Sequence, residues 1–247
     1  LMYTSGTTGH PKGAVLTQNA VQWNAFNSLH MHAMSSADRV LNILPLFHVG
    51  GLNIQTTPIL YVGGTLVLHD KFHPVACLEA IERDRPTLLV LIPATIDAVI
   101  SLPQWEQADL SSLRLLSTGS SHVPRRMLDA FLQRNIPVIQ IYGSTETCPV
   151  AVYQRERDAY AKVGSVGKPG LHSEVRIVDE AGRDVEEGVS GELLVRGPNV
   201  MYEYWGNAEA TSEALRDGWF YTGDVGYRDA DGFLWINDRK RDLVISG

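Results

Sequence analysis

The chain has 247 residues, 44% of them hydrophobic, which is enough for one large or two small packed domains. Its formal net charge is −7 and no run of five like charges occurs, which argues against nucleic acid as the main partner. The two cysteines, Cys77 and Cys148, exclude a disulfide framework and favour a reducing compartment. No apolar run is long enough to span a membrane. From the cysteine usage alone, we expect the protein to be cytoplasmic.

The first part of the chain, up to about residue 150, alternates short apolar runs with helical patterns. The predicted strands, each rich in Val, Ile or Leu, are 39–44, 65–68, 87–92, 114–117 and 138–141. Runs with so little polar alternation are typical of strands that helices cover on both faces. Helices are predicted between them, one after Thr17 as N-cap and others with Pro74 and Pro124 at their first positions. This alternation predicts an α/β fold with a mostly parallel sheet and flanking helices.

The residue pattern changes after about residue 150. Turns that contain glycine become frequent, as in Glu187-Gly188 and Asp231-Gly232, and short strand-like runs lie between them at 174–178, 192–195 and 233–236. Short strands joined by such turns are typical of small sandwiches and barrels. We therefore predict a small β-rich subdomain, in the form of a distorted barrel, over 151–237.

The most informative motif stands at the beginning of the chain. Residues 1–13 read LMYTSGTTGHPKG, a short apolar stretch followed by small residues at 5–9 and then by Pro11-Lys12-Gly13. Backbone amides and hydroxyls in such a loop can surround a polyphosphate, and Lys12 adds a positive charge. The spacing is not that of a Walker A loop, and the alternative interpretation is a solvated turn between two strands.

Five further motifs follow in chain order. They are Pro45-Leu46-Phe47-His48, Gly119-Ser120-Ser121, Tyr142-Gly143-Ser144-Thr145-Glu146, Tyr221-Thr222-Gly223-Asp224 and Asp238-Arg239-Lys240-Arg241-Asp242. Together with the opening loop, this set resembles the signature motifs of the adenylate-forming superfamily, which includes acyl-CoA synthetases and aryl-CoA ligases. Within that superfamily, the stretch 44–53 is most similar to fatty-acid and feruloyl-CoA ligases.

The resemblance implies a reaction in two steps. A carboxylate displaces pyrophosphate from ATP to form an acyl-adenylate, and the acyl group then passes to the thiol of CoA. The implied cofactors are ATP and Mg²⁺, with CoA as the acceptor and a small carboxylic acid as the substrate. Bringing two anions together requires charge neutralisation and alignment at the α-phosphorus. We therefore predict an AMP-forming acid-thiol ligase that acts on a medium- or long-chain fatty acid or an aromatic acid.

By resemblance, most of these motifs contribute to a nucleotide site. The predicted ATP-binding residues are Thr4, Ser5, Gly6, Thr7, Thr8, Gly9, Lys12, Gly119, Ser120, Ser121, Tyr142, Gly143, Thr145, Asp224 and Arg239. Tyr142 offers a flat face to adenine at the carboxyl edge of the sheet, and Asp224 can accept both ribose hydroxyls. Each also has a plain structural interpretation, as a core tyrosine and as a turn aspartate.

Glu146 is the predicted magnesium ligand, because a hard dication that bridges phosphates needs oxygen ligands and one carboxylate is typical. Thr4 is the second predicted metal contact. The predicted catalytic residues are Thr145, Glu146, His48 and Lys12, with His48 placed by resemblance near the carboxylate and the route of the thiol. The alternative interpretations are a surface glutamate at a turn and a histidine packed in a loop.

The predicted acyl pocket contains His48, Gly51, Cys148 and Pro149. The residues after Glu146 are small to medium and apolar, which favours an acid with an apolar or aromatic body. The aspartate with which peptide-synthetase domains bind an α-amino group is not seen near 46–48, which disfavours an amino acid. Two alternatives stay open, an adenylation domain that loads a carrier protein and a nucleotide-binding module without catalysis.

The resemblance also predicts the organisation of the chain. Residues 1–150 form an α/β subdomain that binds nucleotide and acyl group, 151–237 form the β-rich subdomain, and 238–247, with Arg241, form a hinge toward a C-terminal domain. Since the chain begins in the phosphate loop and ends just after the hinge motif, we expect a central fragment of a longer protein, poorly active alone. We expect no membrane span and no nucleic-acid partner.

Overall fold

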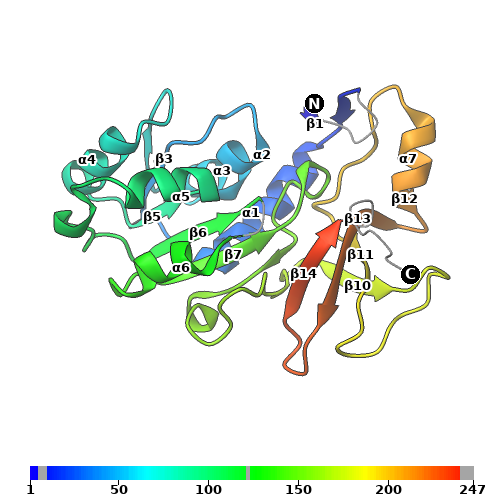
Figure 1. Cartoon of the computed structure of the whole chain (residues 1–247). Coiled ribbons are helices and arrows are strands. Elements are labelled where there is room, and N and C mark those ends of the chain that lie inside the picture. The colour runs from blue at the N-terminus through cyan, green and yellow to red at the C-terminus, as the bar shows by residue number, and fades with distance from the viewer. Residues whose placement is uncertain (5–9, 121–122, 240–247) are drawn as a thin grey trace.

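The fold contains three β-sheets, which Figure 1 shows in a computed structural model that describes residues 1–4, 10–120 and 123–239. A seven-stranded sheet with its helices forms one half of the molecule, and a five-stranded antiparallel sheet forms the other. A small hairpin at the beginning of the chain, β1 (Met2–Thr4) with β2 (Lys12–Ala14), is the third sheet. The predicted α/β fold followed by a β-rich unit is confirmed.

The large sheet has the strand order β4-β3-β5-β6-β7-β8-β9. Its strands are β3 (Arg39–Asn42), β4 (Thr65–Leu68), β5 (Leu88–Val90), β6 (Leu115–Gly119), β7 (Val138–Tyr142), β8 (Val152–Tyr153) and β9 (Lys168–Pro169). The five strands from β3 to β7 are parallel, and β8 and β9 continue the sheet in antiparallel pairs. All five strands predicted before residue 150 are therefore confirmed, with ends that shift by up to two residues.

Helices connect the parallel strands and cover both faces of the sheet. They are α1 (Gln18–His32), α2 (Val49–Gly51), α3 (Thr57–Tyr61), α4 (Pro74–Asp84), α5 (Pro93–Ile100), α6 (Arg125–Leu132) and, in the second half, α7 (Ala208–Ala214). Thr17 caps α1, since its hydroxyl accepts a hydrogen bond of 3.0 Å from the amide of Ala20. Pro124 precedes α6 instead of opening it, because its backbone is extended, so that predicted start was wrong by one residue.

Neighbouring residues of the parallel strands enter two different cores. Leu89 and Leu116 pack with α4, α5 and α6 on one face, whereas Leu88 and Leu115 pack with residues of α1 and α3 on the other. Successive side chains of a strand point to opposite faces, so a strand buried on both sides needs apolar residues at every position. This explains why these strands appear in the sequence as unbroken apolar runs.

The second half of the molecule is a curled antiparallel sheet. Its strands are β10 (Glu174–Val178), β11 (Gly191–Arg196), β12 (Leu215–Arg216), β13 (Trp219–Arg228) and β14 (Leu234–Arg239). Irregular register in β11 and β13 marks two bulges, which increase the curl of the sheet. The three predicted strands of this half are confirmed, but the ten-residue β13 was not predicted.

The hairpin β1–β2 joins the two halves. Gly13, in β2, accepts a hydrogen bond of 2.7 Å from the amide of Trp205, and the amide of Val15 donates one of 2.9 Å to Glu203. β1 also lies against the turn Thr145–Thr147, which follows β7. No helix in the described part of the chain is both long and apolar enough to cross a membrane. The predicted domain boundaries stay a prediction.

Candidate active site

The candidate site lies where the parallel strands β6 and β7 end. Gly119 and Tyr142 are the last residues of these strands, and Gly119 pairs with Ile141 in the ladder. A Cβ atom on Gly119 would lie 2.5 Å from the carbonyl oxygen of Ile141, so this close approach requires glycine. Open α/β sheets bind ligands at the carboxyl edge of their strands, and the predicted nucleotide residues of both motifs meet there.

Tyr142 and Asp224 are in direct contact. The hydroxyl of Tyr142 donates a hydrogen bond of 2.7 Å to Oδ2 of Asp224. Asp224 is held in turn by Thr222, whose hydroxyl accepts from the amide of Asp224 at 3.0 Å and donates to a carbonyl of β11. Arg239 stands opposite Asp224 in the β13–β14 ladder. The structure thus brings together the side chains predicted for adenine and for ribose.

Glu146 is buried in the short turn Thr145–Thr147. Its Oε1 accepts a hydrogen bond of 2.6 Å from the hydroxyl of Tyr204, a residue that was not predicted for the site. Burial and the adjacent Glu146 carboxylate raise the pKa of Tyr204, so its hydroxyl keeps its proton and stays a donor. The Nζ of Lys12 lies 5.0 Å from the centre of the Tyr204 ring. Lys12, Tyr204 and Glu146 therefore form a continuous row.

A metal ion at Glu146 would need most of its ligands from the substrate phosphates and from water. Among the described residues, no group of three or more His, Cys, Asp or Glu side chains could enclose an ion. Mg²⁺ is usually held by one or two carboxylates together with substrate phosphates and water. Tyr204 donates to Oε1 of Glu146, and this carboxylate is the group that would contact such an ion.

The turn after Glu146 is held by buried asparagines. Oδ1 of Asn24 accepts from the amide of Val150 at 2.9 Å, and Nδ2 of Asn27 donates to the carbonyl of Val150 at 3.0 Å. Nδ2 of Asn199 donates to the carbonyl of Thr147 at 2.7 Å. The three asparagines are fully buried, and none of them was predicted for the site. For Asn24 and Asn27, the available signal was the presence of polar residues among the apolar residues of α1.

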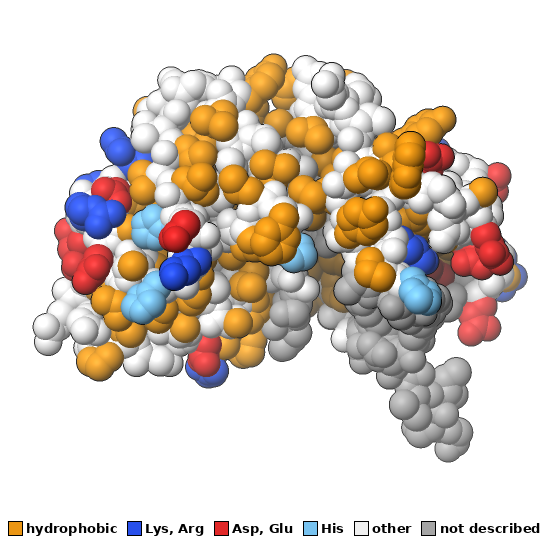
Figure 2. All heavy atoms as spheres, turned by 90° about the horizontal axis from the view of Figure 1, so that it is seen from above, with side chains coloured by type: hydrophobic (Ala, Val, Ile, Leu, Met, Phe, Trp, Pro, Cys, Tyr) orange, Lys and Arg blue, Asp and Glu red, His pale blue; other side chains and the backbone are white. Residues whose placement is uncertain are grey.

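His48 and Thr4 share an open hollow of about 560 Å³. Its lining residues come from the beginning of the chain and from the 45–48 motif: Leu1, Met2, Tyr3, Thr4, Pro11, Leu46, Phe47 and His48. Phe47 is 75% exposed, and its ring centre lies 5.0 Å from that of His48. Figure 2, which looks down on the end of the molecule where β1 lies, shows hydrophobic side chains exposed across this face.

The other predicted acyl-pocket residues are buried. Gly51 packs against the backbone of Pro45, since a Cβ atom there would lie within 2.3 Å of its oxygen. The thiol of Cys148 accepts a hydrogen bond from Nδ2 of Asn53 at 3.3 Å. Burial raises the pKa of the Cys148 thiol to about 12, so it is not a thiolate nucleophile at neutral pH. Pro149 is also buried.

The remaining predicted residues divide into two groups. Ser120 is exposed, and Thr145 and Gly143 are half-buried beside Glu146. The predicted phosphate-loop residues at 5–9, with Ser121 and Arg241, lie outside the described part of the chain. At Tyr204, the sequence shows three aromatic residues within 202–205, which by itself does not indicate a binding residue.

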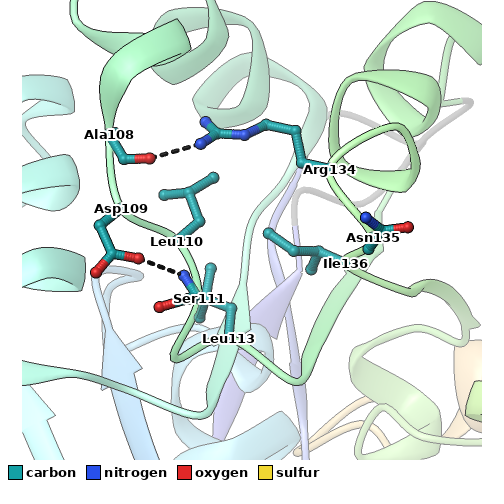
Figure 3. Close-up of a pocket in the computed structure, with 8 residues that line it drawn as sticks. All are labelled: Ala108, Asp109, Leu110, Ser111, Leu113, Arg134, Asn135 and Ile136. Atoms are coloured by element: carbon teal, nitrogen blue, oxygen red, sulfur yellow. Dashed lines mark hydrogen bonds between the residues drawn. The ribbon is translucent and has the colours of Figure 1, made fainter.

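A second hollow, of about 380 Å³, lies at the opposite, amino ends of the parallel strands β6 and β7. Figure 3 shows the residues that line it. It is lined by residues that precede β6 and β7: Ala108, Asp109, Leu110, Ser111, Leu113, Arg134, Asn135 and Ile136. Its charged side chains are already used within the protein, because Arg134 donates to the carbonyl of Ala108 and Asp109 accepts from the amide of Ser111. None of the residues predicted for the nucleotide or acyl site lines this hollow.

The chain is similar to several known ligases. It is 53% identical over its whole length to indoleacetate–CoA ligase of Aromatoleum aromaticum, of which it covers 48%, and 44% identical to a feruloyl-CoA synthase of Amycolatopsis, of which it covers 50%. The structure of o-succinylbenzoate-CoA synthetase from Bacillus subtilis with its acyl-adenylate intermediate matches all of this chain and 50% of its own, with a TM-score of 0.91 and 36% identity. The chain thus spans about half the length of the curated relatives it matches.

A family model matches the first 205 residues of the chain. The model of the AMP-binding enzyme family matches residues 1–205, which include the opening loop, both strand-end motifs and Tyr204. Since this match extends over most of the chain, the protein belongs to the AMP-binding enzyme family.

Proposed function

We propose that the protein activates an aromatic carboxylic acid with ATP, releases pyrophosphate, and transfers the acyl group from the resulting adenylate to CoA. The observation that carries this proposal is the meeting of two residue sets at one edge of the sheet. The pair Tyr142–Asp224 suits a nucleoside, and the row Lys12–Tyr204–Glu146 suits a polyphosphate with its cation. A nucleoside triphosphate with its cation needs both sets in one site.

In this proposal, Tyr142 lies against adenine and Asp224 accepts hydrogen bonds from the ribose hydroxyls. Both side chains are half-buried at the end of β7 and in β13, where a ring can stack on one and a sugar can reach the other. Gly119, Ser120 and Ser121 would border the base. Arg239, opposite Asp224 in the ladder, would add a contact to the ribose or phosphates.

The phosphate side would be held by the opening loop and Lys12, with Thr145 at the α-phosphate. Glu146, assisted by Thr4, would hold Mg²⁺, which supplies charge neutralisation on the phosphates when it is bound. A carboxylate oxygen of the acid attacks the α-phosphorus, the bond to the bridging oxygen breaks, and pyrophosphate leaves. The positive charge of Lys12 reduces the repulsion between the two anions that must approach each other.

For the acid, the relatives named above act on indoleacetate and ferulate, and a solved neighbour acts on o-succinylbenzoate. Each of these acids carries a ring. The exposed rings of Phe47 and His48, next to Thr4, offer a face against which such a ring could stack. His48 would then lie where the CoA thiol approaches the acyl carbonyl. The proposal also includes CoA as the acceptor and the cytoplasm as the compartment, since ATP and CoA are available there. It further includes the pocket residues Gly51, Cys148 and Pro149 and the hinge at Arg241.

The test is a panel of carboxylic acids given to the full-length protein, with pyrophosphate release measured with and without CoA. We expect aryl acids to support release and CoA thioesters to accumulate only when CoA is present. Glu146→Gln is expected to reduce release by at least about 100-fold, since it removes the charge that holds the cation. The matched control is Glu156→Gln, which changes an exposed glutamate in another short turn.

Three results would contradict the proposal in different ways. Pyrophosphate release with acylation of a carrier protein but not of CoA would indicate a loading domain. Tight binding of an acyl-adenylate analogue without turnover of any acid would indicate a binding module. Release that is unchanged in Glu146→Gln would remove the role given to that carboxylate.

A further inference from the structure

One segment of the second half, residues 199–205, contacts the turn of Glu146 at three points. Nδ2 of Asn199 donates to the carbonyl of Thr147 at 2.7 Å. The amide of Met201 donates to the carbonyl of Glu146, also at 2.7 Å. The hydroxyl of Tyr204 donates to the side chain of Glu146 at 2.6 Å. The segment therefore holds both the backbone and the carboxylate of Glu146.

The same segment pairs with the strand that carries Lys12. The amide of Tyr202 donates to the carbonyl of Val15 at 2.9 Å, and the amide of Trp205 donates to the carbonyl of Gly13 at 2.7 Å. Tyr204 stands opposite Ala14 in this short ladder, and its ring lies under Nζ of Lys12. The segment thus reaches Lys12 on one side and Glu146 on the other.

The side chains of residues 199–205 differ in exposure, and this difference shows which of the aromatic residues faces the candidate site. Tyr204 is 7% exposed, whereas its aromatic neighbours Tyr202 and Trp205 are 70% and 64% exposed. Tyr204 is the member whose ring contacts one charged residue and whose hydroxyl contacts the other. Removal of the hydroxyl alone would leave the ring beneath Lys12 and free the Glu146 carboxylate to rotate.

We infer that Tyr204 is a positioning residue for the phosphate end of the site, and that residues 199–205 set the distance between Lys12 and Glu146. Tyr204 binds Oε1 of Glu146 and so fixes the orientation of the carboxylate that would hold the cation, while its ring lies beneath the ammonium group of Lys12. This inference rests on the proposed function, because it gives the cation and phosphates to Glu146 and Lys12. Tyr204 itself touches no reacting atom.

The test compares Tyr204→Phe with Tyr202→Phe in the full-length protein. Loss of one hydrogen bond to a charged group weakens an equilibrium binding constant by about tenfold. We expect Tyr204→Phe to raise the Mg²⁺ concentration for half-maximal rate about tenfold and to lower kcat, with the KM for the acid unchanged. Tyr202→Phe removes an exposed hydroxyl from the same segment and is expected to stay within about twofold of the parent in each quantity.

A binding measurement separates this inference from the proposed function. Mn²⁺ binding in the presence of ATP, followed by electron paramagnetic resonance, is expected to weaken in Tyr204→Phe and not in Tyr202→Phe. Mn²⁺ binding can be measured even if the protein turns over no acid. Absence of turnover would overturn the proposed function but not this inference. Tyr204→Leu, which also removes the ring, is expected to raise the KM for ATP beyond the value in Tyr204→Phe.

Two outcomes would overturn the inference. The first is a Tyr204→Phe variant whose Mg²⁺ dependence, Mn²⁺ binding and kcat equal those of Tyr202→Phe. The second is a variant that loses thermal stability and all kinetic parameters in proportion, because that pattern indicates a structural role only. Circular dichroism at the assay temperature shows whether each variant is folded.

Discussion

The hydroxyl of Tyr142 donates a hydrogen bond of 2.7 Å to Oδ2 of Asp224. Tyr142 ends the parallel strand β7, and Asp224 lies in the antiparallel strand β13, so this bond joins the two halves of the molecule at the candidate site. One carboxylate oxygen is thereby oriented before any nucleotide arrives. A preset acceptor lowers the entropic cost of binding a ribose.

Tyr142→Phe is expected to weaken ATP binding while preserving the ring face for adenine. The variant removes one hydrogen bond to a charged acceptor, so we expect the KM for ATP to rise by about three- to tenfold, with kcat little changed. The measurement is steady-state pyrophosphate release at varied ATP. Tyr160→Phe is the matched control, because Tyr160 is 54% exposed. A KM for ATP equal to that of the control would show that Tyr142 does not orient Asp224 for the sugar.

The large sheet was predictable because each of its parallel strands is buried on both faces. Leu88, Leu89, Leu115 and Leu116 are fully buried, and such runs have few alternative structures. The strand β13 escaped prediction for the opposite reason. Gly223, with φ of +73°, and Asp224 interrupt its apolar pattern, and local pattern does not show that partner strands stabilise it on both sides.

The candidate site was predictable in its motifs but not in its contacts. The Tyr142 and Asp224 motifs were named from the sequence, yet their hydrogen bond depends on how two sheets pack, which no local pattern encodes. Tyr204 was missed because a tyrosine in an aromatic run is usually a core or surface residue. Asn24 was missed because its role, pairing the backbone of Val150, exists only in the folded state.

Gly143→Ala is expected to disturb the turn that carries Glu146. A Cβ atom at this position would lie 1.6 Å from the carbonyl oxygen of Pro149 and 2.6 Å from Oγ1 of Thr147, so the backbone must move. We expect a loss of about 1–3 kcal/mol in the free energy of unfolding and a larger proportional loss of kcat. Urea unfolding and pyrophosphate release measure the two effects.

The control for this change is Gly50→Ala. The nearest atom to a Cβ at Gly50 is Cδ1 of Ile54 at 3.9 Å, which is an ordinary contact, and Gly50 lies in a helical stretch. Its free energy of unfolding should therefore equal or slightly exceed that of the parent. A Gly143→Ala variant as stable and active as the parent would contradict the described packing of the turn.

Asn24→Ala is expected to destabilise the protein because it leaves two buried backbone groups without hydrogen-bond partners. Its amide side chain accepts from the amide of Val150 and donates to the carbonyl of Asn53, and all three groups are buried. Each of the two unpaired buried groups costs about 1–3 kcal/mol, so we expect the free energy of unfolding, measured with urea, to fall by about 2–6 kcal/mol. Asn19→Ala, an exposed position on the same helix, is the control. Equal stability of the two variants would show that the pairing contributes little.

His32 is expected to make stability fall as the pH drops below neutrality. The side chain is 1% exposed, with Nε2 2.7 Å from the hydroxyl of Ser117 and Nδ1 2.9 Å from the carbonyl of Ser28. Burial, with a smaller contribution from the charge of Arg114, lowers the pKa of His32 from 6.5 to about 4, against an opposing effect of the hydrogen bond to Ser28. The folded protein therefore keeps His32 neutral where the unfolded chain protonates it.

The sign of the effect follows from proton linkage. Between pH 6.5 and about 4 the unfolded state binds one more proton at this residue, so the free energy of unfolding falls as the pH falls, by at most about 1.4 kcal/mol for each pH unit. Above pH 6.5 this dependence disappears, because both states are neutral. Urea unfolding at pH 7.0, 5.5 and 4.5 measures this dependence.

His32→Gln cannot titrate at this position. We expect it to be less stable at pH 7.0, but its free energy of unfolding should change less with pH. The control, His10→Gln at an exposed position, should keep the pH dependence of the parent. If His32→Gln keeps that dependence as well, the acid sensitivity arises elsewhere, and the buried imidazole is not the group that takes up the proton on unfolding.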